Sequence, residues 1–302
     1  MSGRGAELWK ITPVRYLLNI RSYSRAARCP PGSRIGDTYA SYLGAHYWTE
    51  MSASIPPITH PRSAVSGASL KSDSSPRNKI LRLLPPAELA ALVERSELVE
   101  VKSKQIFWEP EQPLEYAYFP EDCVISLVTV MENGDQVEAM TVGNDGFAGI
   151  PVFHEVETAK HKACGQISGM ALRVGVKDFH SLARELPGLR RLLHRYSEFV
   201  FETVAQSAAC NRLHVIEQRC ARWLLMSQDR VGRDSFDLTQ EFLAEMLGVR
   251  RPGVTVAMGI LEKAGLIAHG RGNITVVNRP GLEKASCECY RTIRARQAKL
   301  IA

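Results

Sequence analysis

Residues 239–277 contain the pattern that most constrains the fold, because two stretches with apolar residues at helical spacing meet at a glycine. Thr239 suits the N-cap of the first helix, since a threonine hydroxyl accepts a hydrogen bond from the backbone N–H groups at a helix start. Gly248 can adopt the positive φ that a tight turn between helices needs. Pro252 suits the first turn of the second helix, where its missing N–H would be unpaired anyway.

The stretch after the second helix is typical of a β-hairpin. Gly265 ends the helix, and a strand beginning at Leu266 turns at the sequence HGRGN and returns through Val277. This is the layout of a winged helix-turn-helix, whose second helix enters the major groove of DNA. Arg251 is expected to contact guanine, and Arg250 the backbone. The full set of expected DNA contacts is Thr239, Gln240, Arg250, Arg251, Thr255 and, in the wing, Arg271.

The charge distribution favours the same interpretation. Residues 212–302 contain 15 Lys and Arg against 9 Asp and Glu, whereas residues 76–211 contain 14 against 19. A basic C-terminal part joined to an acidic centre indicates that only the former meets a polyanion. The alternative is that these arginines merely solvate helix surfaces.

The first 75 residues do not resemble a folded domain. They are rich in Ser, Pro and Arg and show no sustained apolar period, so we expect a disordered extension over residues 1–75. No apolar run approaches the roughly 20 residues of a membrane helix. Seven cysteines without a secretory signal fit a reducing cytoplasm, so a cytoplasmic protein without a membrane partner is expected.

Residues 76–186 are expected to form many short strands. Apolar runs over residues 98–101, 105–108, 116–119 and 124–131 are separated by turn residues, among them the hairpin signal ENGD at 132–135. Short strands at such intervals favour an antiparallel β-barrel or jelly roll of the double-stranded β-helix type. The predicted fold class is therefore α+β.

A long helix is expected over residues 187–212. Apolar and small residues recur along it in steps of four and three, which predicts a continuous seam on one side. The seam packs either on its own barrel or on a second chain, and we favour the second chain, because a two-fold DNA reader needs a symmetric dimer. The seam residues are Leu189, Leu193, Tyr196, Val200, Thr203 and Ser207.

The order of these parts resembles the Crp/Fnr family of bacterial transcription regulators. The resemblance rests on a short-stranded barrel, a long helix after ELPGLRRLL, the stretch SAACNRLHVIEQRCARWLL and the winged helix-turn-helix. It implies a homodimer that binds double-stranded DNA and RNA polymerase and senses a signal through its barrel. The implied domains are a cyclic-nucleotide-binding-like sensor (76–186), a dimerisation helix (187–212), a Crp-type winged helix-turn-helix (213–290) and a C-terminal tail (291–302).

Members of this family that sense cyclic nucleotides carry a phosphate-binding cassette, and here it is degenerate. Gly149 and Thr158 match the cassette, but Ile150 stands where the ribose-binding Glu would be, and Glu157 where the phosphate-binding Arg would be. Replacing a guanidinium by a carboxylate turns a charge-assisted contact into repulsion. We therefore expect that cyclic AMP and cyclic GMP do not bind through the usual contacts, which leaves the effector unidentified.

The second helix of the motif departs from the family pattern as well. Where many members present Arg-Glu followed later by another Arg, this chain has Arg251, Pro252 and, at the later position, Val256. The operator of the better-known members is therefore not expected here.

No cofactor or metal is expected. Members with an iron–sulfur cluster need several closely spaced cysteines, whereas here only Cys287 and Cys289 lie close together in the sequence, and incidental buried thiols are the preferred interpretation. A small metal or redox site built from His154, His161 and Cys164 is the alternative.

Catalysis is not expected, and no catalytic residue is assigned. His161 with Cys164, and His214 with Cys210, each lack an evident third orienting group, and packing explains the latter pair at a spacing of four on a helix. Besides a Cys/His enzyme, the remaining alternative is a signalling or scaffold module with weak DNA binding.

Overall fold

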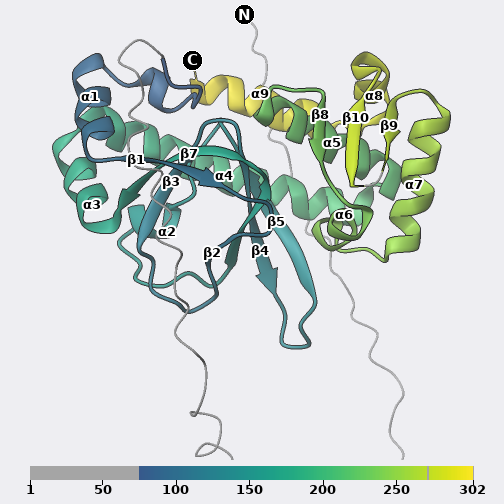
Figure 1. The fold of residues 1–302 in the computed structure, drawn as a ribbon, viewed down its shortest axis with the longest axis horizontal. Coiled ribbons are helices and arrows are strands. Elements are labelled where there is room, and N and C mark those ends of the chain that lie inside the picture. Colours follow the sequence, from purple (N-terminus) through teal and green to yellow (C-terminus); the bar gives the residue numbers. More distant parts are fainter. Residues whose placement is uncertain (1–74, 271, 302) are drawn as a thin grey trace, which may run out of the picture. The chain divides into compact units, whose positions relative to one another are not determined.

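A computed structural model describes residues 75–270 and 272–301, all within one compact unit, Arg62–Ala302 (Figure 1). Apart from Ser75, the predicted disordered extension lies outside the described residues. In the part of the chain that is described, no helix is both long and apolar enough to span a bilayer.

The first half of this unit contains two antiparallel sheets, preceded by a 3₁₀ turn (η1, Leu81–Leu83) and helix α1 (Pro86–Glu94). One sheet has the order β1 (Glu97–Val101), β7 (Gly169–Gly175), β3 (Tyr116–Pro120). The other has the order β2 (Ile106–Trp108), β6 (Lys162–Ile167), β4 (Val124–Val130), β5 (Gln136–Val142). The α+β class with short antiparallel strands is thus confirmed.

These two sheets do not close into the barrel form of the prediction. Among the described residues, isolated bridges of Pro113 with Thr158 and of Tyr118 with Ala148 occur outside the two ladders. Register shifts interrupt β2 beside β6 and β4 beside both its neighbours. Such irregularities bend strands and end their pairing, which leaves two facing sheets.

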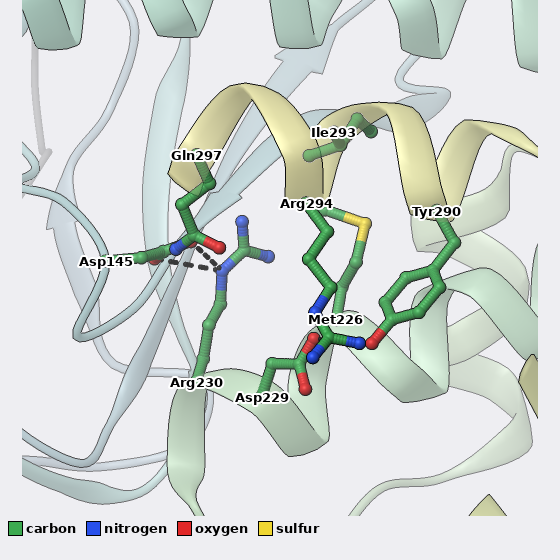
Figure 2. A pocket seen from close by; sticks show the side chains of 8 residues that line it. All are labelled: Asp145, Met226, Asp229, Arg230, Tyr290, Ile293, Arg294 and Gln297. Carbon is green, nitrogen blue, oxygen red and sulfur yellow. Dashed lines mark hydrogen bonds and ion pairs between the residues drawn. The ribbon is translucent and has the colours of Figure 1, made fainter. Parts of the chain in front are cut away.

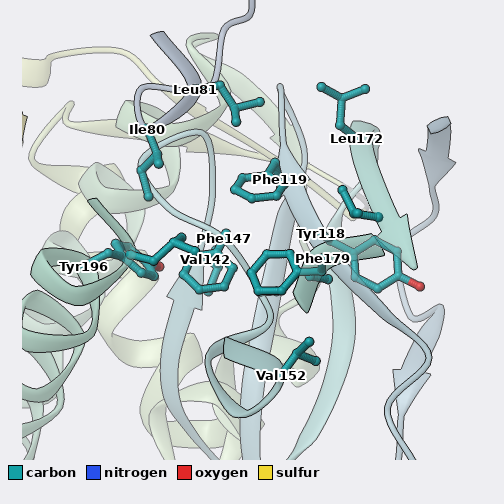
Figure 3. Close-up of a cluster of buried hydrophobic side chains, with 14 of the residues drawn as sticks. Ile80, Leu81, Tyr118, Phe119, Val142, Phe147, Val152, Leu172, Phe179 and Tyr196 are labelled. Carbon is teal, nitrogen blue, oxygen red and sulfur yellow. The ribbon is translucent and has the colours of Figure 1, made fainter. Parts of the chain in front are cut away.

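Stacked aromatic side chains fill the core of this sheet domain (Figure 3). The ring of Phe147 lies 5.6 Å from Phe119 and 5.9 Å from Phe179 of helix α3 (Val176–Glu185), measured between centroids. Tyr196 of the long helix α4 (Pro187–Leu213) meets Phe147 at 5.2 Å. Offset and tilted aromatic pairs of this kind add to the stabilisation from burial, so α4 is fixed to the sheet domain by its aromatic residues.

The structure corrects the predicted dimer seam on α4. Leu189, Leu193 and Tyr196 are fully buried in the core of their own chain, and Thr203 is buried as well. Val200 and Ser207 are partly buried. The spacing arises because this side of α4 packs on its own chain, which was the alternative interpretation, so the four buried residues are not available to a second chain.

The second half contains the predicted winged helix-turn-helix, with one more strand than expected. Helices α6 (Gln240–Leu247) and α7 (Arg251–Lys263) precede strands β9 (Ile267–His269) and β10 (Asn273–Val276). β10 pairs on its other side with β8 (Ser235–Asp237). Helix α8 (Arg279–Ala285) follows, and helix α9 (Cys289–Ile301) occupies the residues expected as a tail and packs along α4.

Helix α5 (Ile216–Val231) joins the two halves through a buried ion pair. Arg230 Nε lies 3.1 and 3.0 Å from the two carboxylate oxygens of Asp145, and its Nη1 donates to the hydroxyl of Thr141. Figure 2 shows Arg230 extending from α5 to Asp145 beside α9. Both charged side chains are almost fully buried. Because removing one partner would leave a buried charge unpaired, this contact strongly favours the observed packing of α5 on the sheet domain.

Glu138 of β5 makes a second polar contact with α5. Trp223 Nε1 donates to Glu138 Oε1 at 3.1 Å, and Ser126 Oγ lies 2.8 Å from both Glu138 Oε2 and Gln166 Oε1. The single hydroxyl proton of Ser126 cannot serve both oxygens, whereas a protonated Glu138 can donate to Ser126 while Ser126 donates to Gln166. Burial raises the pKa of Glu138 to about 7, against hydrogen bonds from Ser126 and Trp223 that lower it.

This shift predicts that stability falls as pH rises from about 4.5 to about 7. In that window the folded protein keeps the proton on Glu138, whereas the unfolded chain has already released it, so folding is favoured at the acidic end. We expect the variant Glu138→Gln, which cannot titrate, to remove on the order of 1 kcal/mol of this pH dependence. Urea unfolding at a series of pH values checks it, and identical pH slopes in both proteins would contradict it.

Candidate DNA-binding surface

Helix α6 begins at Thr239 as the sequence predicts. The backbone at Thr239 is extended, and its Oγ1 accepts a hydrogen bond from the N–H of Phe242 at 3.2 Å. Leu243, Ala244, Met246 and Leu247 form the buried side of the helix. The capping threonine and the exposed side of α6 are thereby held at the surface of the domain.

The turn between α6 and α7 depends on Gly248, which has a φ of 61°. The N–H of Val249 donates to Ala244 O at 3.0 Å, and Arg219 of α5 donates through Nη2 to the carbonyl of Leu247. A side chain at position 248 would also meet Val137 of β5 at 2.3 Å. Glycine is therefore required both by the backbone conformation and by the contact with the sheet domain.

Helix α7 places its basic start at the surface. Arg250 is the N-cap residue and Pro252 lies in the first turn, as predicted. Val254, Ala257, Met258 and Leu261 are buried and fix the rotation of the helix about its axis. Arg250, Arg251 and Thr255 are consequently exposed.

Two exposed apolar side chains continue the same outward face of α7. Val256 is 60% exposed and Ile260 is 47% exposed. Neither contributes to the buried side of the helix, so both belong, like Arg251, to its exposed surface. The face therefore combines one guanidinium with methyl groups, which are the contacts suited to guanine and to the methyl group of thymine, respectively.

A hydrogen bond that the sequence did not indicate links the two helices. Thr255 Oγ1 lies 2.8 Å from Gln240 Oε1 and 3.2 Å from the carbonyl of Arg251. Because this bond joins residues from α6 and α7, it orients the Gln240 amide toward the start of α7. Arg271, the expected wing contact, lies outside the described residues.

The four residues of the degenerate cassette lie around the short helix α2 (Ile150–Phe153). Gly149 precedes this helix, and Ile150 is partly buried against the core of the sheet domain. Glu157 is exposed, and its carbonyl accepts a hydrogen bond from Leu114 N at 3.1 Å. Thr158 forms the bridge with Pro113. Ile150 thus contributes to apolar packing at the position where the family places an acceptor.

The histidine and cysteine of the first candidate catalytic pair behave as packing residues. The His161 ring lies edge-on to Trp108 with centroids 5.9 Å apart, and burial lowers its pKa. Burial also raises the pKa of Cys164 to about 11. A neutral imidazole and a protonated thiol are a poor starting point for nucleophilic chemistry.

Comparison with known proteins identifies one domain in the C-terminal part of the chain. Residues 218–285 match the family model of the Crp-like helix-turn-helix domain. Among curated proteins, non-structural polyprotein 1A of Human astrovirus-8 is 28% identical over 182 residues, which cover 59% of this chain and 19% of the polyprotein. The chain spans about a fifth of the length of that relative, and the match establishes no family.

Solved structures share the fold over about two thirds of this chain. A protein from Eubacterium rectale assigned to the Crp/Fnr regulators aligns with a TM-score of 0.52 and 14% identity over 67% of this chain and 94% of that one. FixK2 from Bradyrhizobium japonicum also aligns with a TM-score of 0.52 and 14% identity, over 64% of this chain and 98% of FixK2. The c-di-GMP-responsive global regulator CLP from Xanthomonas campestris aligns with a TM-score of 0.52 and 13% identity, over 64% of this chain and 99% of CLP.

Residues 218–285 thus form a Crp-like helix-turn-helix domain, and the chain shares the fold of solved Crp/Fnr regulators. The family resemblance seen in the sequence agrees with this domain match and with this fold. The individual DNA contacts stay predictions.

Proposed function

We propose that this chain regulates transcription as a homodimer that places α7 in the major groove at each half of a two-fold DNA site. The observation that carries the proposal is the start of α7, where Arg250, Arg251 and Thr255 are exposed on a helix whose rotation is fixed by buried residues. RNA polymerase is the further partner of this proposal.

In this proposal Arg251 reads guanine and Val256 contacts the methyl group of thymine. Arg250, as the N-cap residue, and Gln240, held by Thr255, contact the phosphate backbone and fix the position of the helix. Arg251 and Val256 stand where the better-known Crp/Fnr members have several polar side chains that contact bases. This difference favours an operator sequence other than theirs.

DNA binding itself is tested by selecting sites from random DNA with purified protein, followed by a mobility shift with salt titration. We expect a preferred two-fold sequence and an affinity that falls linearly on a logarithmic salt scale, because bound cations are released from the phosphates. Absence of both a sequence preference and a salt dependence would contradict the proposal and favour the scaffold alternative.

Because Arg251 and Arg250 have separate roles in this proposal, replacing each of them is expected to reduce DNA affinity in a different way. Arg251→Ala should weaken binding to the selected site by about 1–3 kcal/mol with little effect on random DNA. The matched control Arg250→Ala should weaken binding to both DNAs alike and lower the salt slope by about 1. Equal losses on selected and random DNA for Arg251→Ala would show that it does not read a base.

For the dimer we propose the outward face of α4 in place of the predicted seam. Phe201 is 70% exposed, and Val204, Ala205 and Ala208 follow it on the same exposed side of the helix. These positions recur at steps of three and four, as in a helix that pairs with a second copy of itself. A large exposed aromatic beside small residues is suited to such a contact.

A charged residue at the centre of this face is expected to separate the dimer. Phe201→Glu places like charges opposite each other in a two-fold contact, so the mass measured by light scattering should fall from dimer to monomer at micromolar concentration. The control Met131→Glu makes the same change at an exposed apolar residue of the β4–β5 turn and should remain dimeric. A dimeric Phe201→Glu protein would place the interface elsewhere.

A further inference from the structure

Four side chains of metal-binding type gather where α4 ends and α9 begins. Cys210 lies in the last turn of α4, and His214 follows as its C-cap residue. Cys287 lies in the link after α8, and Cys289 is the first residue of α9. One sulfur or nitrogen atom from each of these residues lies within 4.8 Å of all the others.

The distances in this cluster fit a single tetrahedral ion. Cys210 Sγ lies 3.5 Å from Cys287 Sγ, and Cys289 Sγ lies 3.6 Å from His214 Nδ1. Metal–ligand bonds of about 2.0–2.3 Å give edges of about 3.5–3.8 Å in a tetrahedron of sulfur and nitrogen ligands. A four-iron cluster needs its thiolates farther apart, since the metals and sulfides must fit between them.

All three thiols are free and buried. They form a small group of their own, separate from the larger apolar clusters. Buried cysteines in ordinary apolar packing would adjoin aliphatic or aromatic side chains, whereas these lie against one another and against an imidazole.

Two of the four side chains are themselves hydrogen-bonded by neighbouring residues, as metal ligands in proteins usually are. His214 turns Nδ1 toward Cys289, while its Nε2 lies 3.1 Å from Glu288 Oε2. A carboxylate in this position fixes the tautomer and makes the other nitrogen a better ligand. Gln206 Nε2 is 3.1 Å from Cys289 Sγ and donates to it.

Buried positive charge faces the same cluster. Arg219 and Arg222 of α5 are both buried, each has an Nε atom without a hydrogen-bond partner, and among the described residues neither has a carboxylate within 4 Å. Both guanidinium groups are near enough to the cysteines to interact with them electrostatically. Three thiolates with a divalent ion carry a net charge of −1, which these guanidinium groups would offset.

We propose that Cys210, His214, Cys287 and Cys289 bind one Zn²⁺ ion as a tetrahedral structural site that joins the end of α4 to the start of α9. All four positions are filled by protein, which is typical of structural zinc. Binding releases the thiol protons to solvent and uses the neutral imidazole through Nδ1, with the Nε2 proton held by Glu288. The site does not depend on DNA binding.

The first test measures metal in the full-length protein, purified without an affinity tag and under reducing conditions. We expect about one zinc ion per chain by plasma mass spectrometry. Replacement by Co²⁺ should give sulfur-to-cobalt charge-transfer bands and the intense visible bands of tetrahedral coordination. Wild-type protein without bound zinc, with a Cys210–Cys287 disulfide, or with stoichiometric iron would each overturn the proposal.

Variants then assign the ligands. Cys289→Ser should lose most of the zinc, and Cys220→Ala, a buried cysteine of α5 outside the cluster, should keep it. Glu288→Gln should retain the ion but bind it about tenfold to hundredfold more weakly in a chelator competition, because the imidazole loses its carboxylate. Full zinc affinity in both Cys289→Ser and Glu288→Gln would overturn the assignment.

Discussion

The ion pair between Arg230 and Asp145 is the contact on which the arrangement of the described structure depends. Two charges buried together are costly unless both are fully paired, and this pair is satisfied by the two carboxylate oxygens and by Thr141. It fixes α5 against the sheet domain, while the apolar side of α5 belongs to the core of the winged helix-turn-helix. Val124, Val128 and Ile167 of the sheet domain belong to this second core, so the sheet domain and the winged helix-turn-helix pack directly on each other.

This constraint also explains the glycines in the loop that carries Asp145. A Cβ at Gly143 would lie 2.5 Å from the side chain of Arg230, and one at Gly146 would lie 2.0 Å from the Tyr196 hydroxyl oxygen. Both glycines thus make room for α5 and α4, which come from distant parts of the sequence. The local sequence does not indicate this requirement, because it arises from contacts with Arg230 and Tyr196.

The parts that sequence predicted well are those determined by near neighbours. The Thr239 cap and the positive φ at Gly248 follow from residues within one turn, and both are confirmed. The seam on α4 was wrong because Leu189 and Tyr196 have the same spacing whether they pack on their own sheets or on another chain. Burial within the chain decides between these cases, and the remaining exposed face, with Phe201, is visible only once the buried one is known.

The cysteine and histidine cluster extends this argument to chemistry. Cys210 and Cys287 are 77 residues apart in the sequence, so spacing alone could not bring them together, and each half of the cluster looked incidental. Helix α4 is anchored in the core of the sheet domain by Tyr196, and in its last turn Cys210 contacts Cys287 beside the start of α9. The proposed site would thus join the end of a helix that is anchored in the sheet domain to the start of α9, the helix that follows the winged helix-turn-helix.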